Sequence, residues 1–354
     1  MASFAEPSGG APRTELIRVE PGGVNLEKMT RLDQVASRVA TGAISPADGR
    51  RRLSDILHAP ARYGQTITIL FYGISSAAAA RFFNGGWREM FAAGVIGTLI
   101  GVISGFSGKR PALAPAADAL SALLTALAAP LLATLIPPLA VQTVLLAALI
   151  VLIPGFTLTL ALNELATRNL SSGTARLAAA GITFLQLGFG LALGTRLAQR
   201  WGGADLVAPI AAVPLPAWTL GVALLIAPLG FVVLFKAARR DTGWIVLAGL
   251  IAFAGARWGA GVLGPELGVF PGALALGLYG NFYARFKRRP AAVPVVPGLM
   301  FLVPGSLGLR SFSAFLENRV ESGLSAVFTM ALIAVSLVAG LLIANVIVSP
   351  KKSL

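Results

Sequence analysis

The sequence predicts an all-helical integral membrane protein. Of its 354 residues, 56% are hydrophobic and 12% are charged, and the mean hydropathy is +0.78. Soluble domains carry about 25% charged residues and cover their outside with polar groups. This composition therefore excludes a soluble fold, a disordered chain and a coiled coil. From Thr66 onward, apolar runs recur along the chain at about the 20-residue length that a helix needs to cross a bilayer.

The residue inventory also excludes several kinds of site. The chain has no Cys and one His, so thiolate and multi-histidine metal sites, Cys-ligated haem and disulfides are excluded, and we expect no cofactor and no metal. The formal net charge is +14, but the basic residues are spread along the chain rather than gathered in one stripe. A membrane protein is basic because it keeps Lys and Arg on the cytoplasmic side. We therefore expect lipid, and no nucleic acid, as the charged partner.

Residues 1–65 are expected to form a cytoplasmic segment with two short helices. No apolar run in this segment is long enough for a secretory signal. The first helix is predicted from Leu26 to Ala40, where apolar residues recur at helical spacing. The second is predicted to start at Ser45-Pro46, because Ser45 can cap it and Asp48 stands at the third position of a capping box.

The rest of the chain is predicted to contain ten membrane-spanning helices. The third and fourth are separated only by Pro137-Pro138, so the alternative is one re-entrant hairpin and a total of eight. The predicted spans are 66–84, 89–107, 115–136, 138–161, 173–196, 217–235, 243–263, 266–284, 292–312 and 324–347.

The basic residues predict the orientation. With ten spans and a cytoplasmic N-terminus, 22 of the 29 Lys and Arg residues fall on the inner side. Such a bias is typical of cytoplasmic loops. We therefore expect a multi-pass protein of the inner (plasma) membrane with both termini in the cytoplasm.

An internal repeat divides the spans into two halves. Ile153-Pro154-Gly155 recurs 150 residues later as Val303-Pro304-Gly305, and Ser172-Gly173 and Gly190 recur at the same offset as Ser322-Gly323 and Gly340. Chance is the alternative explanation, because Gly and Pro are abundant. The predicted repeats cover 66–200 and 217–350. Five spans per half is an odd number, so the second half enters the membrane from the opposite side, as in many secondary transporters.

The chain resembles the threonine/serine exporter family of bacterial and fungal membrane proteins over residues 27–350. The resemblance rests on motifs whose order matches the family. They are Ala43-Ile44-Ser45-Pro46, Ala59-Pro60-Ala61-Arg62-Tyr63, Phe83-Asn84-Gly85-Gly86-Trp87, Ile153-Pro154-Gly155-Phe156-Thr157-Leu158, Glu164-Leu165, Ser172-Gly173-Thr174-Ala175-Arg176 and Pro304-Gly305.

The resemblance implies ten spans, a cytoplasmic N-terminal portion and export of threonine or serine driven by the proton gradient. A related two-chain branch of the family is associated with succinate. Members usually carry a longer soluble N-terminal region than the one matched here, with an additional helical stretch ahead of it.

The two Pro-Gly breaks are the predicted substrate site. Proline removes a helix hydrogen bond, and a broken helix survives in lipid only where protein or a wet cavity surrounds it. The freed backbone groups and nearby hydroxyls can bind the ammonium and carboxylate of an amino acid. A simple packing kink is the alternative. The predicted substrate-binding residues are Pro154, Gly155, Thr157, Thr159, Pro304, Gly305, Ser306 and Arg310.

Two carboxylates are predicted to carry the coupled proton, because ionisable groups within spans are costly and usually functional. Glu164 lies near the cytoplasmic end of the fourth span, where the alternative is a pair with Arg168 at i+4. Asp118 opens the third span, where the alternative is an ordinary first-turn carboxylate. Arg310 has a structural alternative as well, a marker of the periplasmic edge.

These features predict a secondary transporter that works by alternating access, and not an enzyme. The first alternative is a dicarboxylate exporter on the same scaffold, with a cationic site around Arg310 or Arg81. The second is a membrane-embedded hydrolase or a scaffold protein. A hydrolase needs a nucleophile and a base at membrane depth, and the single His58 lies outside the predicted spans.

Overall fold

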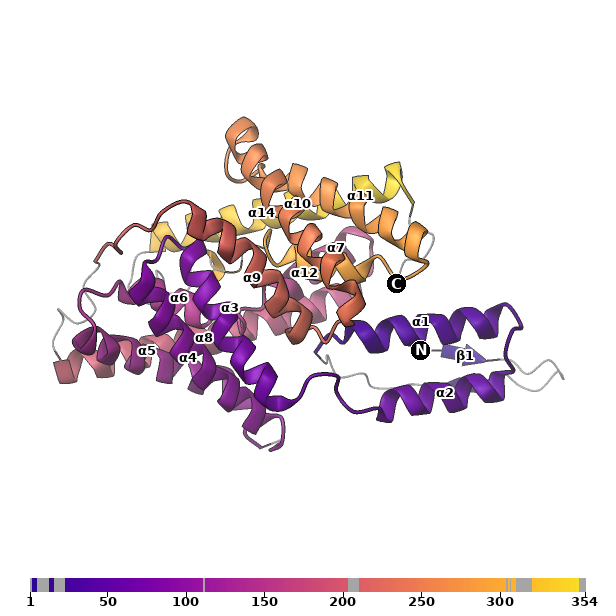
Figure 1. Cartoon of the computed structure of the whole chain (residues 1–354), viewed down its shortest axis with the longest axis horizontal. Coiled ribbons are helices and arrows are strands. Elements are labelled where there is room, and N and C mark those ends of the chain that lie inside the picture. Colours follow the sequence, from indigo (N-terminus) through magenta and orange to yellow (C-terminus); the bar gives the residue numbers. More distant parts are fainter. Residues whose placement is uncertain are drawn as a thin grey trace.

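The computed structural model describes residues 2–4, 13–15, 23–110, 112–202, 210–303, 305, 307–309 and 320–349. Within these residues the protein is almost entirely helical (Figure 1). The exceptions are two three-residue strands, β1 (Ala2–Phe4) and β2 (Arg13–Glu15), which pair in an antiparallel hairpin. The all-helical fold class predicted from the sequence is confirmed for the described residues.

Two helices follow the hairpin and lie at one side of the helical body (Figure 1). They are α1 (Leu26–Ala40) and α2 (Pro46–His58), and they pack against each other. The Ser45 hydroxyl accepts a hydrogen bond from the Asp48 amide at 3.1 Å, so the predicted cap of α2 is present. The packing is close, because Gly49 of α2 leaves room for the Val39 side chain of α1.

The first half of the helical body contains six α-helices. The predicted fourth span is two helices, because the chain leaves the helical path between α6 and α7, where Pro154 and Gly155 stand. The elements are α3 (Gln65–Phe82), α4 (Trp87–Ser107), η1 (Ala114–Ala116), α5 (Ala117–Leu135), α6 (Val141–Ala148), α7 (Gly155–Ala166) and α8 (Leu170–Gly202).

The second half repeats this order over the residues that are described. A long helix is followed by two more, by a short helix that ends before the second break, and by a long final helix. The elements are α9 (Trp218–Leu234), η3 (Arg239–Asp241), α10 (Thr242–Leu263), α11 (Val269–Lys287), α12 (Ala292–Leu299) and α14 (Val320–Ile347).

The helices of the two halves pack in matching pairs. The contacts of α3 with α4, α4 with α5 and α5 with α8 correspond to those of α9 with α10, α10 with α11 and α11 with α14. Gly190 of α8 lies against residues 119–123 of α5, and Gly340 of α14 lies in the same way against residues 270–274 of α11. In both places a Cβ added to the glycine would contact three atoms of the facing helix. They are a carbonyl oxygen, the Cβ of the residue three positions after that carbonyl, and the amide nitrogen of the residue that follows this Cβ. Small residues therefore serve the same close helix packing in both halves.

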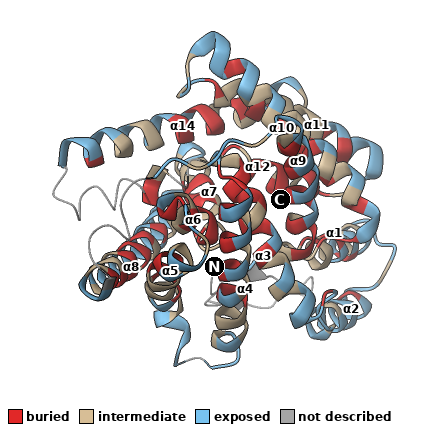
Figure 2. Ribbon diagram, turned by 60° about the vertical axis from the view of Figure 1, so that its left-hand side comes forward, coloured by how far each residue is buried: buried red, intermediate tan, exposed pale blue. Residues whose placement is uncertain are grey.

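Within the described part of the chain, five elements are long and apolar enough to cross a membrane, and a shorter apolar helix spans Trp218–Leu234. Large apolar side chains are exposed on these helices, among them Phe91 and Phe189. Figure 2 shows exposed residues along the outer sides of the helices and buried ones toward the middle. Such continuous apolar surface fits lipid rather than water. The five elements are Trp87–Ser107, Ala114–Leu135, Leu170–Trp201, Arg239–Leu263 and Val320–Ile347. The third predicted span is one of these five elements, whereas the fourth is divided between α6 and α7.

Candidate functional site

The helix breaks in the two halves have the same local geometry. After α6, the Leu149 carbonyl accepts hydrogen bonds from the amides of Leu152 at 2.9 Å and Ile153 at 3.2 Å. After α12, the carbonyl of Leu299 accepts in the same pattern from the amides three and four residues later, at 2.8 and 3.0 Å. The chain therefore leaves the helix through the same turn at positions 150 residues apart.

The two breaks lie against each other. A Cβ placed on Gly155 would be 3.5 Å from the Cα of Gly305, and a Cβ placed on Gly305 would be 3.6 Å from the Cα of Gly155. The Val303 side chain covers Gly155, and the Ile153 side chain covers Gly305, whose added Cβ would lie 2.5 Å from Ile153 Cγ2. The contact is thus reciprocal, and in this structure these two apolar side chains fill the space between the breaks.

Polar groups gather where α7 starts. Thr159 is buried, and its hydroxyl donates to the Gly155 carbonyl at 3.1 Å, while Thr157 is half-buried. The amides of Phe156 and Thr157 belong to the first turn, where a helix has no intrahelical carbonyl for them. This end of α7 therefore has positive character, and these two amides have no partner among the described residues, which suits a carboxylate. Of the predicted residues in the second break, Gly305 is described, whereas Pro304, Ser306 and Arg310 lie outside the described residues.

The two predicted proton carriers lie away from the breaks. Arg176 Nε donates to both carboxylate oxygens of Glu164, at 2.9 and 3.1 Å, which joins α7 to α8. The alternative pairing with Arg168 is wrong, because α7 ends at Ala166 and Arg168 takes a left-handed conformation with φ of 65°. Asp118 is half-buried in the first turn of α5, where it forms no ion pair with a described residue.

A buried carboxylate at the start of α4 was not predicted from the sequence. Glu89 is 2% exposed. One of its oxygens accepts from the Gly86 amide at 2.8 Å, and the other accepts from the Ala140 amide at 2.8 Å. Glu89 therefore fastens the start of α4 to the turn that precedes α6, and both of its oxygens are occupied by backbone amides.

Asp241 is the counterpart of Glu89 in the second half. It is also 2% exposed, and it accepts from the Tyr283 hydroxyl at 3.0 Å and from Arg289 Nη1 at 2.6 Å. The preceding turns match at an offset of 152 residues, since Asn84 and Lys236 both have positive φ. Each carboxylate thus ties the second helix of its half to the loop before the broken helix. In the sequence, the one sign that Glu89 and Asp241 correspond is that each follows a turn residue, Asn84 or Lys236, by five positions.

The first helices of the two halves cross each other. Ser75 of α3 lies against Gly230 of α9, and further along α3 the Arg81 Nε donates to the Thr219 hydroxyl at 2.7 Å. From one contact to the next, the residue number rises along α3 and falls along α9, so the two helices are antiparallel. Ser76, next to Ser75, donates to the carbonyl of Ala148 at 3.2 Å, so α3 also reaches the last residue of α6.

The N-terminal helices are fixed to the turn after α9. The Leu26 amide donates to the Phe235 carbonyl at 3.0 Å, and the Tyr63 hydroxyl donates to the Ala237 carbonyl at 3.0 Å. Arg62 forms an ion pair with Glu27 at 2.7 Å, which joins the segment before α3 to α1. Burial raises the pKa of the Tyr63 phenol; the nearby guanidinium groups oppose this shift and Glu27 adds to it.

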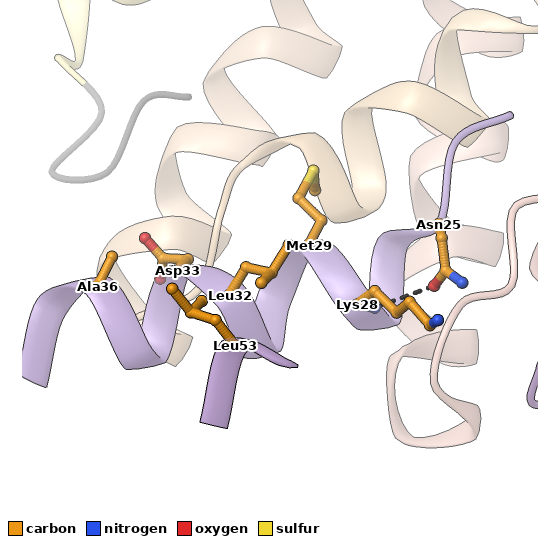
Figure 3. Close-up of a pocket in the computed structure, with 7 residues that line it drawn as sticks. All are labelled: Asn25, Lys28, Met29, Leu32, Asp33, Ala36 and Leu53. Atoms are coloured by element: carbon orange, nitrogen blue, oxygen red, sulfur yellow. Dashed lines mark hydrogen bonds between the residues drawn. The ribbon is translucent and has the colours of Figure 1, made fainter. Parts of the chain in front are cut away.

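Two surface grooves lie away from the breaks. The first, of about 490 Å³, runs along α1 beside Leu53 of α2 (Figure 3). It is lined by Asn25, Lys28, Met29, Leu32, Asp33, Ala36 and Leu53. The second lies between Glu266 and the first turns of α14. No group of three or more metal-ligating side chains occurs among the described residues.

Two family profiles match this chain. Residues 1–198 match the profile described as "Putative threonine/serine exporter", and residues 221–347 match "Threonine/Serine exporter, ThrE". Because the first match alone covers more than half of the chain and the second covers most of the remainder, the family assignment does not depend on one motif.

The similar curated proteins are fungal. The pheromone-regulated membrane protein 10 of Candida albicans is 24% identical over 325 residues, which cover 88% of this chain and 29% of that protein. Its namesake in Eremothecium gossypii is 23% identical over 348 residues, covering 92% and 45%. An uncharacterized protein of Schizosaccharomyces pombe is 25% identical over 379 residues, covering 96% and 44%.

The chain therefore spans less than half the length of these relatives. No solved structure matches it. The apolar helices, the matched halves and the two family matches lead to one conclusion: the chain belongs to the threonine/serine exporter family of membrane proteins.

Proposed function

We propose that this protein is a secondary transporter that exports threonine or serine across the plasma membrane, coupled to the proton gradient by alternating access. The family membership supports transport of a small molecule, and the reciprocal contact of the two helix breaks is the observation that carries the proposal. Two breaks that meet between matched halves provide one central site that each half can expose in turn.

The proposed architecture is ten spans in two inverted repeats. Its support is the matched helix pairing, together with the antiparallel crossing of α3 and α9, the first helix of each half. Equivalent helices of the two halves are expected to run in opposite directions when each half contains an odd number of spans. The reciprocal contact of Gly155 with Gly305 fits a two-fold axis that passes between them.

The substrate is proposed to bind where the breaks separate. The first-turn amides of α7 suit its carboxylate, and the backbone carbonyls freed at the turns suit its ammonium group. The proposed binding residues are Pro154, Gly155, Thr157 and Thr159 from the first half and Pro304, Gly305, Ser306 and Arg310 from the second. Because Ile153 and Val303 fill this space in the present conformation, the site opens only when the two halves move apart.

Glu164 is the first proposed proton carrier, with Asp118 as the second. The Glu164 carboxylate is 17% exposed and bound to Arg176, so its protonation would release the α7–α8 contact. Such a release would link the charge of one carboxylate to the position of the helix that carries half of the site. This step rests on the proposed alternating access.

We propose cytoplasmic termini because most Lys and Arg residues fall on the predicted inner side. Contacts among the loops predicted on that side support this proposal. The segment before α3 contacts the turn after α9 through Tyr63, and Asp241 in the next loop pairs with Arg289 in the loop before α12. Arg285 donates to the carbonyl of Ser349 near the C-terminus at 2.9 Å. These basic loops belong to the predicted inner side.

The test is transport by the purified protein in liposomes that are loaded with labelled threonine or serine. An imposed proton gradient should drive the amino acid out, and a protonophore should stop the net movement. If neither amino acid moves faster than from protein-free liposomes, the proposal is wrong. Inhibition of labelled threonine efflux by succinate would instead favour the dicarboxylate alternative.

A further inference from the structure

Arg81 stands out because it is a buried cation. It is 8% exposed and is the only Lys or Arg of the described residues whose side chain is buried. It lies in the last turn of α3, where this helix packs against α9. Its Nε donates to the hydroxyl of Thr219 at 2.7 Å, and that hydroxyl donates in turn to the carbonyl of Pro216 at 2.7 Å.

No carboxylate of the described residues pairs with this guanidinium. Glu89, the buried acid near the start of the following helix, uses both of its oxygens on backbone amides. A buried charge without a counter-ion is costly, and ionisable groups kept within membrane segments usually serve function. The carbonyl end of α3 supplies partial negative charge, but this is weaker than a full anion.

The tip of the Arg81 side chain has no hydrogen-bond partner among the described residues. Among the described residues, the only fully enclosed side-chain polar atom without a partner is Ser75 Oγ. The Nη1 and Nη2 atoms of Arg81 form no hydrogen bond with a described residue and do not belong to that enclosed, unpartnered class. Two adjacent N–H groups of a guanidinium match the two oxygens of a carboxylate, so the free edge is suited to a bidentate contact.

The position of Arg81 relates it to the helix breaks. Ser76 of the same helix bonds to Ala148, the last residue of α6 before the first break. Arg81 follows Ser76 by five residues, which is about 7.5 Å along a helix axis. In the proposed topology α3 runs from the cytoplasmic to the outer side, so Arg81 lies on the outward side of the break.

We propose that Arg81 binds the carboxylate of the transported amino acid on the outward side of the central site. Thr219 holds the guanidinium by its Nε, which leaves the Nη1–Nη2 edge for the ligand. The identity of the ligand as an amino acid rests on the proposed function, whereas the carboxylate chemistry rests on Arg81 itself.

Transport provides the first test. External threonine and threoninol, which lacks only the carboxylate, compete with labelled threonine counterflow in liposomes. The wild-type protein should prefer threonine at least tenfold, and Arg81→Gln should reduce this preference at least tenfold. The control is Arg88→Gln, because Arg88 is exposed, lies on the next helix and, among the residues that the structure describes, bonds only to the carbonyl of Pro138. An equal loss for both competitors in Arg81→Gln would overturn the proposal.

A second test does not depend on transport. The unfolding temperature of the purified protein is measured in acetate and in acetamide at equal ionic strength. Acetate should stabilise the wild type and Arg88→Gln but not Arg81→Gln, and an equal response of all three would overturn the proposal.

If Arg81→Gln does not fold, Arg81→Lys replaces it, because lysine lacks the planar fork. Its acetate response should be at least halved, and an unchanged response would overturn the proposal. Failure of the wild type to move threonine or serine would instead reject the proposed function.

Discussion

Gly155 and Gly305, which belong to different halves of the chain, lie in direct contact, with the Cβ position of Gly155 only 3.5 Å from the Cα of Gly305. Val303, two positions before Gly305, covers Gly155, and Ile153, two positions before Gly155, covers Gly305. Both covering residues are β-branched. Such side chains are stiff at χ1, so they leave little freedom to accommodate a larger residue. The contact therefore sets how closely the two halves meet.

Gly155→Ala should disturb this contact. The added methyl would collide with Val303, at a cost of about 1–3 kcal/mol for overpacking, and threonine counterflow should fall at least tenfold. Gly155→Ala combined with Val303→Ala should recover much of the activity. Gly181→Ala is the control, because nothing lies within 4 Å of its Cβ position. Equal activity of Gly155→Ala and Gly181→Ala would show that the breaks do not control transport.

Glu164→Gln should separate proton coupling from substrate binding. If the Glu164 carboxylate carries the proton, threonine exchange between equal pH values should be retained while export driven by a proton gradient is lost. Arg176→Gln removes the partner of the same pair and serves as the structural comparison. A parallel loss of exchange and driven export in Glu164→Gln would instead assign this residue a structural role.

Asp241→Asn should destabilise the protein strongly. Breaking a buried ion pair leaves the Arg289 charge without its partner, which costs about 3–5 kcal/mol. Asp48→Asn is the matched control, because its pair with Arg51 is exposed and contributes about 0.2–1 kcal/mol. Thermal unfolding in detergent measures both, and similar losses in the two variants would contradict the assigned importance of Asp241.

The hydrogen bond from Tyr63 to Ala237 should make stability depend on alkaline pH. Because burial raises the pKa of Tyr63, its contribution is fully present below the ordinary tyrosine value near 10 and is lost as pH rises through the higher folded value. Tyr63→Phe should lower stability by about 0.5–1.5 kcal/mol at neutral pH. The difference between wild type and Tyr63→Phe should shrink only above about pH 10, as measured by thermal unfolding at each pH. A difference that shrinks between pH 6 and 8 would contradict this assignment.

Single cysteines can test the proposed topology, because the chain has no Cys of its own. Lys109→Cys and Pro265→Cys place thiols at exposed positions in loops predicted on opposite sides. An impermeant thiol reagent added to intact cells should label Pro265→Cys, whereas Lys109→Cys should react only after permeabilisation. The reverse pattern would invert the proposed orientation, and labelling of both from outside would reject it.

The helices themselves could be predicted from local sequence. Apolar length marked the spans, Ser45 marked the start of α2, and Pro154 marked the break between α6 and α7. Each of these signals acts within one or two helical turns, so it can be read without knowing what the helix packs against. The proposed site residues in the breaks were found for the same reason.

The partners of individual side chains depended on tertiary structure. Sequence spacing suggested Arg168 as the partner of Glu164, but the end of α7 turns the chain and brings Arg176 to the carboxylate instead. The buried positions of Glu89 and Asp241 were likewise not evident, because their importance comes from loops about 50 residues away.

The sequence by itself indicated a helical membrane protein and predicted two similar halves, because hydrophobic length and Pro-Gly spacing are properties of the chain. Only the tertiary structure decided that the two breaks touch and that Arg81 lies buried without an acidic partner among the described residues. The physical reason is that contact and burial depend on how helices pack across the molecule, and no local pattern encodes which distant side chain fills the space beside a given residue.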